Sequence, residues 1–418
     1  MQLTVYLLYT VITVACINTA LARLARIASG VLPELSKDVR SLPTKLGGLG
    51  LRSLSHIREP AYYASWLKSL KFINEVLPFF YRFARLSTFN LQFMQEHIEN
   101  LPPNDSQSTS FLDVIDPMVQ APLVFQTQKA LTVAVDSALH QKVLSTYTPT
   151  NREAISIFVS QATDGLASWL FSALFYNRKD LRVEDKDFFE AIRIRMLLPT
   201  HDDATVLPRC NSCKIDNPSL YHGYCCRKLS GAYIGRHNRV VRAVAEFAKA
   251  CTTSGVVDVL IEERVGAPQV GDRTCRADIA LHWGNSVHYV DVQVCSCTST
   301  TSLLGRFGAI NPNVPPSAGW AIAQAENSKF VKYANRHDLE RHQLTPFVLD
   351  MTGRLGHQAN EFVNKLSKIF GDHHDAITIS DERLKTARKN FIQRLGVELV
   401  RGNGHMVRKY HHFLQTGM

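Results

Sequence analysis

The spacing of apolar side chains divides the chain into a helical first half and a second half that mixes strands with helices. Helical spacing runs through residues 17–32, 61–83 and 122–198. A Gly-rich turn, LPTKLGGLGLRS, separates the first two of these segments, and the polar stretch 99–110 has the composition of a linker. We therefore expect the first half to be mainly helical.

Short runs rich in β-branched residues begin after Pro199 and predict a separate α/β region. Strands are expected over residues 256–261, 277–283, 287–294 and 346–351. Helical patterns precede the first strand, lie over residues 321–336 and follow the last strand. The end of the chain, from Arg401 to His412, is rich in Lys, Arg and His and is expected to be a solvated basic tail.

Four of the nine cysteines crowd into one short stretch, which favours metal ligation by reduced thiols over disulfide bonds. Cys210, Cys213, His222 and Cys226 give the spacing C-x2-C-x8-H-x3-C. A two-residue gap lets one tight turn present both thiolates to a tetrahedral ion, and four protein ligands make such a site structural. The spacing predicts a zinc knuckle, with Cys225 as an alternative fourth ligand and chance clustering as the other interpretation.

A hairpin is expected over residues 276–294, RADIALHWGNSVHYVDVQV. If its Gly-Asn pair forms a two-residue turn, Trp283 pairs with Ser286 and Asp278 falls opposite Asp291. Opposed β-carbons lie about 4.5 to 5.5 Å apart, so the two carboxylates repel each other unless a cation lies between them. Oxygen ligands with open positions predict Mg²⁺ or Mn²⁺ there.

Two alternatives to this metal site are open. A turn one residue longer pairs Asp278 with Val292, and the two aspartates can also be ordinary residues at strand ends. Period-two alternation places Gln293 on the face of Asp291 and makes it a third candidate.

A lysine on the helix expected over residues 321–336 is a further candidate. Glu326, Lys329 and Tyr333 fall on one helical face at spacings of three and four residues. A lysine there can orient water or stabilise charge on a phosphate, whereas a solvated surface lysine is the alternative.

The charge balance narrows the class of partner. The 418 residues include 47 Lys and Arg against 37 Asp and Glu, a net charge of +10. This excess favours an anionic partner, such as nucleic acid or a membrane surface, although a merely basic globular protein has the same balance. The length suffices for two or three domains that fold without disulfides.

Residues 1–22 contain no charged side chain, so a signal peptide or membrane span is one interpretation. The positive segment that begins a signal peptide is missing, and Thr and β-branched residues are frequent. A segment from inside a larger domain has the same pattern, and we expect no membrane attachment.

Several segments together resemble the C-terminal region of non-long-terminal-repeat (LINE-type) retrotransposon polyproteins whose endonuclease is restriction-enzyme-like. Residues 42–66 resemble the segment that follows the reverse transcriptase thumb. The Cys/His cluster, the tripeptide RHN at 236–238, Asp278, the strand around Asp291 and the KxxKY pattern at 329–333 then follow in the order of that family.

The sequence departs from the family's pattern at two positions. Ala277 stands where the family has proline before its first aspartate, although residues 279–290 provide the expected spacer before Asp291. Gln293 occupies the position where many PD-(D/E)XK nucleases have lysine, and the resemblance implies that Lys329 or Lys332 substitutes for it.

The resemblance implies an α+β multidomain fold, with a mainly helical N-terminal half, then a zinc knuckle and an α/β restriction-endonuclease-like domain built on a central mixed sheet. The implied divisions are a thumb-like remnant at 1–60, a helical linker domain at 61–198, the zinc knuckle at 199–235, the nuclease-like domain at 236–370 and a helical basic tail at 371–418.

The implied activity is metal-dependent nicking of target DNA in the nucleus, so that the exposed 3′ end primes reverse transcription. Asp278 and Asp291 would bind the ion, assisted by Gln293 and Lys329. The expected contacts to nucleic acid are Arg236, His237, Arg276, Lys332 and Tyr333.

No Tyr-x-Asp-Asp motif occurs, so the chain is not expected to polymerise DNA. The expected partner is DNA, with the element's RNA as a further candidate and no small-molecule substrate. A catalytically inactive nucleic-acid-binding relic is the main alternative, and a membrane-anchored or secreted protein is a third.

Overall fold

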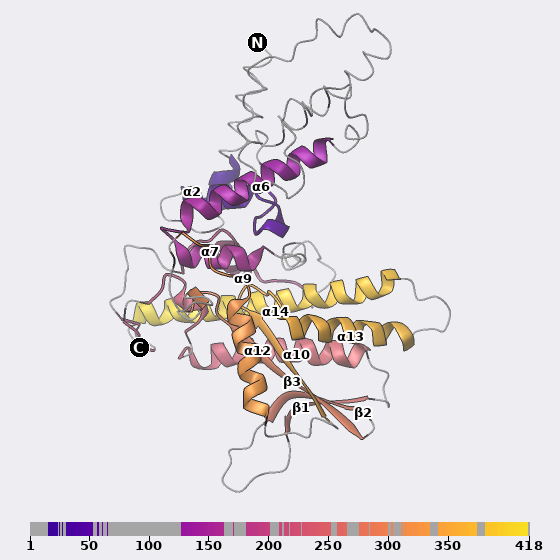
Figure 1. Cartoon of the computed structure of the whole chain (residues 1–418). Helices are drawn as coiled ribbons and strands as arrows, with labels where there is room; N and C mark the ends of the chain where they lie inside the picture. Colours follow the sequence, from indigo (N-terminus) through magenta and orange to yellow (C-terminus); the bar gives the residue numbers. More distant parts are fainter. Residues whose placement is uncertain are drawn as a thin grey trace, which may run out of the picture. The chain divides into compact units, whose positions relative to one another are not determined.

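The structure, a computed structural model, divides into two compact units (Figure 1). The first comprises residues 1–43 and 48–147, and the second comprises residues 44–47 and 148–418. The structure describes residues 16–23, 25, 27, 31–52, 57, 61, 65, 127–162, 170, 181–200, 209–210, 213–216, 218–226, 228–251, 257–265, 276–283, 285–299, 302–303, 311, 313–334, 342–373 and 381–416.

Several expectations for the first half fall outside the described residues. These are the linker at 99–110, nearly all of the helix at 61–83, and most of the uncharged segment 1–22. Among the residues that are described, no helix has the length and apolar character needed to cross a membrane.

The described part of the first unit is helical, as expected. It contains α2 (Glu34–Ser41) and α6 (Thr127–Tyr147), and residues 16–23 are also helical. Lys142 of α6 forms an ion pair with Asp38 of α2 at 3.2 Å. After α2 the chain turns back on itself, and the N–H of Gly50 donates to the carbonyl of Leu42.

This turn requires a glycine at position 48. A Cβ at Gly48 would lie 2.0 Å from the carbonyl oxygen of Leu42, a distance that no other residue type tolerates. The Gly-Gly-Leu-Gly run therefore has a local structural cause.

The second unit contains all four described strands and most of the helices. In chain order its elements are η1 (Thr44–Leu46), α7 (Arg152–Gln161), α9 (Asp185–Arg195), η6 (His222–Tyr224), α10 (Ser230–Cys251), β1 (Val257–Arg264), β2 (Arg276–Trp283), β3 (Ser286–Cys295), α12 (Trp320–Tyr333), β4 (His342–Asp350), α13 (His357–His373) and α14 (Asp381–Thr416).

The strands form one mixed sheet in the order β1-β2-β3-β4. β1, β2 and β3 are antiparallel neighbours, while β4 runs parallel to β3. A parallel neighbour needs a crossover connection, and α12 lies within it. The expected α+β class and mixed sheet are thus confirmed.

Helices cover both faces of the sheet (Figure 1). On one face, α10, α13 and α14 pack against Val290, Val292 and Val294 of β3 in the largest apolar cluster described. On the other face, α12 packs through Tyr333 against Tyr289 of β3 and against β2. Alternate residues of β3 thus face different helices, as strand geometry requires.

The prediction of a solvated tail from Arg401 to His412 was wrong. This segment is the last part of α14, and Met406, Val407 and Tyr410 are buried in it. Their spacing makes an apolar stripe within a basic sequence, which the high content of Lys, Arg and His concealed.

Candidate functional site

The predicted Cys/His cluster is assembled in the structure. The ligand atoms of Cys210, Cys213, His222 and Cys226 all lie within 4.8 Å of one another. The first two cysteines lie on a tight turn in which Lys214 adopts a left-handed backbone with φ of 63°. This is the only group of three or more His, Cys, Asp and Glu ligand atoms at that spacing among the described residues.

Of the two candidates for the fourth ligand, Cys226 belongs to the cluster and Cys225 does not. The N–H of Cys226 donates to the carbonyl of His222 at 2.9 Å, and this turn brings the Cys226 sulfur into the cluster. The Cys225 sulfur instead donates to the His222 carbonyl oxygen at 3.5 Å and is not one of the four.

The donor set fits zinc. Burial raises the pKa of the Cys226 thiol to about 12, so this sulfur ionises at neutral pH only beside a cation. Three thiolates and one imidazole in a buried, closed set are typical ligands of a structural zinc ion. The cluster can therefore bind a metal ion such as zinc.

The Cys/His cluster packs against α10 and α14. Cys210 and Cys226 share an apolar cluster with Ala232 of α10 and with Met406 and Tyr410 of α14. The His222 ring also meets the Tyr410 ring edge-on, with centroids 5.8 Å apart.

Arg236 links this cluster to the sheet region. Its guanidinium, which is 3% exposed, donates to the Tyr224 carbonyl at 2.8 Å and to the Asn403 side chain at 2.9 Å. Asn403 in turn donates to the Met351 carbonyl after β4. A Cβ at Gly402 would lie 2.6 Å from the Arg236 side chain, so α14 needs glycine there. Arg236 was expected to contact DNA, but this burial gives it a structural role.

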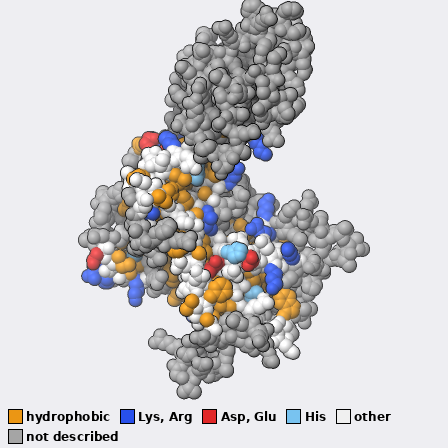
Figure 2. Space-filling model, in the orientation of Figure 1, with side chains coloured by type: hydrophobic (Ala, Val, Ile, Leu, Met, Phe, Trp, Pro, Cys, Tyr) orange, Lys and Arg blue, Asp and Glu red, His pale blue; other side chains and the backbone are white. Residues whose placement is uncertain are grey.

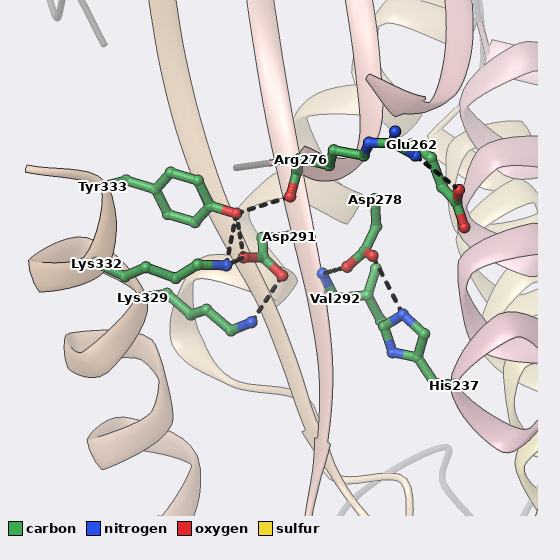
Figure 3. A network of polar contacts seen from close by, with 9 residues as sticks. All are labelled: His237, Glu262, Arg276, Asp278, Asp291, Val292, Lys329, Lys332 and Tyr333. Carbon is green, nitrogen blue, oxygen red and sulfur yellow. Dashed lines mark hydrogen bonds and ion pairs between the residues drawn. The ribbon is translucent and has the colours of Figure 1, made fainter. Parts of the chain in front are cut away.

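The second candidate site lies where β2 and β3 separate (Figure 3). Trp283 pairs with Ser286, as predicted, and the pairing continues to Ile279 and Val290, where it ends. Beyond this point β2 pairs with β1 alone, while residues 291–295 of β3 pair with β4 alone. We call this separation the strand fork.

Asp291 lies at the strand fork on the face of α12. Its Oδ1 accepts from Lys329 at 2.7 Å, and its Oδ2 accepts from Lys332 at 3.2 Å and from the Tyr333 hydroxyl at 2.6 Å. Burial alone would raise the pKa of Asp291, but Lys329 and its other two partners outweigh burial and bring the pKa below the ordinary value of 3.8. Asp291 is therefore a buried carboxylate whose charge is balanced by lysine.

Asp278 turns to the opposite side of the strand fork, toward α10 (Figure 3). Its Oδ1 lies 3.2 Å from His237 Nε2, and its Oδ2 accepts from the N–H of Val292 at 2.7 Å. The predicted register is confirmed from Trp283–Ser286 to Ile279–Val290, one residue short of the two aspartates. The carboxylates of Asp278 and Asp291 do not face each other, because they turn to opposite sides.

A break in strand alternation explains the direction of Asp278. Ala277 and Ala280 both pack on the α12 side with Tyr333, whereas Ile279 packs on the α10 side. Ala277 and Ala280 are three positions apart, and residues an odd number of positions apart face opposite sides of a regular strand, so the alternation is interrupted between them. Asp278 consequently turns its side chain to the same side as Ile279.

A cavity of about 250 Å³ lies beside β3 at the strand fork. It brings together four predicted site residues, Arg236 and His237 from α10, Gln293 from β3 and Lys329 from α12. Its lining residues are Tyr233, Arg236, His237, Val292, Gln293, Val294 and Lys329.

The remaining predicted DNA contacts differ in exposure. The Arg276 side chain is 49% exposed and lies 3.7 Å from Glu262, and that of Lys332 is 47% exposed. Tyr333 is fully buried, and its hydroxyl donates a hydrogen bond to Asp291. Sequence reasoning missed the contact between His237 and Asp278, because no local signal connects residues on a helix and a distant strand.

No protein-family model matches the chain, and no curated protein is similar to it in sequence. The functional argument therefore depends on the residues themselves.

Proposed function

We propose that the chain is the endonuclease-bearing part of a LINE-type retrotransposon polyprotein and that it nicks target DNA in a metal-dependent reaction. The observation that carries the proposal is the cavity at the strand fork, which is lined by His237, Gln293 and Lys329. Two of these side chains contact the aspartates, His237 at Asp278 and Lys329 at Asp291. In this proposal the sheet with its flanking helices is the restriction-endonuclease-like domain, and the Cys/His cluster is its zinc knuckle. Target-primed reverse transcription places the reaction in the nucleus.

The edge of the cavity offers oxygen donors for a divalent cation. The Asp278 side chain is 22% exposed and Gln293 lines the cavity, and a carboxylate with an amide oxygen suits Mg²⁺ or Mn²⁺. Such an ion would activate water and neutralise charge on the phosphate. Asp291 has both oxygens engaged by Lys329, Lys332 and Tyr333, so we assign it a positioning role and not the metal-binding role expected from the sequence.

Lys329 supplies the positive charge that the cavity presents to a phosphate. Its side chain is only 16% exposed, and Asp291 holds its ammonium group at 2.7 Å. A preorganised cation in a partly dry site stabilises developing negative charge better than a mobile surface lysine does. Asp291 and Tyr333 therefore serve the reaction by fixing Lys329 in place.

The half-exposed side chains of Lys332 and Arg276 are suited to bind DNA phosphates outside the cavity. Contacts of this kind position the duplex without reading its sequence. The net charge of +10 adds attraction that does not depend on sequence.

The test is a plasmid-nicking assay with Mg²⁺ or Mn²⁺ on the zinc-loaded chain. We expect Asp278→Asn and Asp291→Asn each to reduce nicking about a hundredfold or more, because each disturbs charge stabilisation at the phosphate. Asp258→Asn, at an exposed position of β1, is the matched control and should nick normally. Equal nicking by all three variants would overturn the proposal.

A nucleic-acid-binding protein without turnover is the second candidate. The positive net charge and the lysines that occupy Asp291 favour it, because neither requires a catalytic ion. Folded, zinc-loaded wild type that binds DNA but never nicks it would establish this candidate in place of the nuclease.

A further inference from the structure

An imidazole nitrogen and a carboxylate oxygen meet at the strand fork. His237 Nε2 and Asp278 Oδ1 lie 3.2 Å apart, with side chains 29% and 22% exposed. Both groups are therefore accessible to a small ligand, and they come from different elements, α10 and β2.

The carboxylate is held in a fixed orientation. The second oxygen of Asp278 accepts the N–H of Val292 at 2.7 Å, which leaves the first oxygen directed to His237 (Figure 3). A hydrogen bond of this kind commonly orients the free oxygen of a metal-binding carboxylate.

The adjacent cavity has room for an ion and its waters. His237 and Val292 both line the space of about 250 Å³, and Gln293 adds an amide oxygen. One water molecule occupies about 30 Å³ in the liquid, so several fit beside an ion. Two ligands at right angles on an ion with bonds of about 2.1 Å lie about 3 Å apart, which matches the separation of Nε2 and Oδ1.

We infer that His237 and Asp278 together bind a divalent transition-metal ion such as Mn²⁺ at the edge of this cavity. His237 is then a metal ligand and not a contact to DNA. The inference deepens the proposed nuclease function and depends on it only for the use of the ion in catalysis. Because an imidazole suits transition metals better than Mg²⁺, the site should prefer Mn²⁺ to Mg²⁺.

Asp291 does not complete this site. His237 and Asp278 belong to no group of three or more close His, Cys, Asp or Glu ligand atoms among the described residues. The remaining positions on the ion would be filled by Gln293, water and, in a complex, a phosphate oxygen.

A second histidine–carboxylate pair on the same sheet provides a matched control. His282 Nε2 lies 2.5 Å from Glu263 Oε2, with side chains 30% and 26% exposed. Neither residue lines the cavity. The His282–Glu263 pair has the same chemistry and a similar exposure as the His237–Asp278 pair, but it does not adjoin the cavity. His282→Ala therefore shows the effect of removing a histidine–carboxylate pair that is not part of the proposed site.

The experiment titrates the zinc-loaded full chain with Mn²⁺ and follows the free ion by electron paramagnetic resonance. We expect His237→Ala to weaken Mn²⁺ binding about tenfold or more, because loss of a residue that only orients a metal ligand already has an effect of this size. His282→Ala should bind Mn²⁺ like wild type. Magnetic coupling of the bound ion to an imidazole nitrogen should appear in wild type and in His282→Ala and disappear in His237→Ala.

Three outcomes separate the inference from the proposed function. Mn²⁺ binding with nitrogen coupling but without nicking keeps the inference and removes the nuclease. Nicking that persists in His237→Ala, with no nitrogen coupling in wild type, keeps the nuclease and overturns the inference. Unchanged Mn²⁺ affinity in a folded His237→Ala variant also overturns it.

Discussion

The direction of the Asp278 side chain determines which residues meet at the strand fork. In a regular strand its side chain would share a face with Ala280 and point toward α12, but Ala277 takes that face and Asp278 points toward His237. The sequence predicted the register from the turn, because turn length fixes which residues pair. It could not predict the break in alternation, which depends on how Ala277 and Ala280 pack against Tyr333.

His288 on β3 should make stability depend on pH. Burial lowers its pKa from 6.5 to about 4, and its Nε2 lies 2.7 Å from the Thr345 hydroxyl. The unfolded chain takes up a proton near pH 6.5, whereas the folded chain does so only near pH 4. The stabilisation is therefore complete above pH 6.5 and is lost as the pH falls toward 4, by up to about 3 kcal/mol.

Urea unfolding between pH 7.5 and 4.5 tests this prediction. The fall in stability should be smaller in His288→Gln, and His357→Gln, at a 75% exposed side chain, should behave like wild type. An identical pH dependence in all three proteins would contradict the assignment to His288.

At the scale of elements, the strands were easier to predict than the ends of the helices. The expected strand at 287–294 is β3 (Ser286–Cys295), because alternation marks a strand with its two faces against different helices. The expected strand at 346–351 begins earlier, at His342, where its pairing with β3 starts. Helix α14 continues through the basic end of the chain because Met406, Val407 and Tyr410 pack inward.

The Cys/His cluster is a second case in which the sequence pattern left a local detail open. Cys225 and Cys226 are adjacent, so spacing alone fits both, and only the turn of η6 determines which sulfur points inward.

Zinc content of two neighbouring variants tests this assignment. We expect Cys226→Ser to lose bound zinc and to unfold at lower urea concentration, because a structural ion contributes directly to folding. Cys225→Ser should retain one zinc ion per chain, since its sulfur lies outside the cluster. Metal analysis after dialysis against a weak chelator distinguishes them, and the reverse pattern would show that Cys225 is the ligand.

At the scale of the whole molecule, charge is spread over many sites. Figure 2 shows Lys and Arg side chains interspersed with acidic ones on the visible face. Several arginines are neutralised locally, as Arg239 is by Glu398 and Arg408 by Asp187. Net charge therefore predicts affinity for nucleic acid but not the surface that binds it, and the retroelement origin stays a prediction from motif order.

DNA affinity measured at several salt concentrations locates part of that surface. If Lys332 contacts a phosphate, Lys332→Gln should reduce the slope of log affinity against log salt by about one. Lys249→Gln, at an exposed position of α10, is the control and should leave the slope unchanged. Equal slopes in both variants would exclude Lys332 from the interface.

The strand fork also bears on how this protein can be improved. A continuous ladder between β2 and β3 would add backbone hydrogen bonds, each contributing about 1 kcal/mol, and would take the N–H of Val292 away from the Asp278 carboxylate. Substitutions that close the gap would therefore raise the melting temperature while releasing Asp278 from the orientation that directs it to His237. A screen for thermal stability alone would select them, so engineering of this chain has to score cavity function alongside heat resistance.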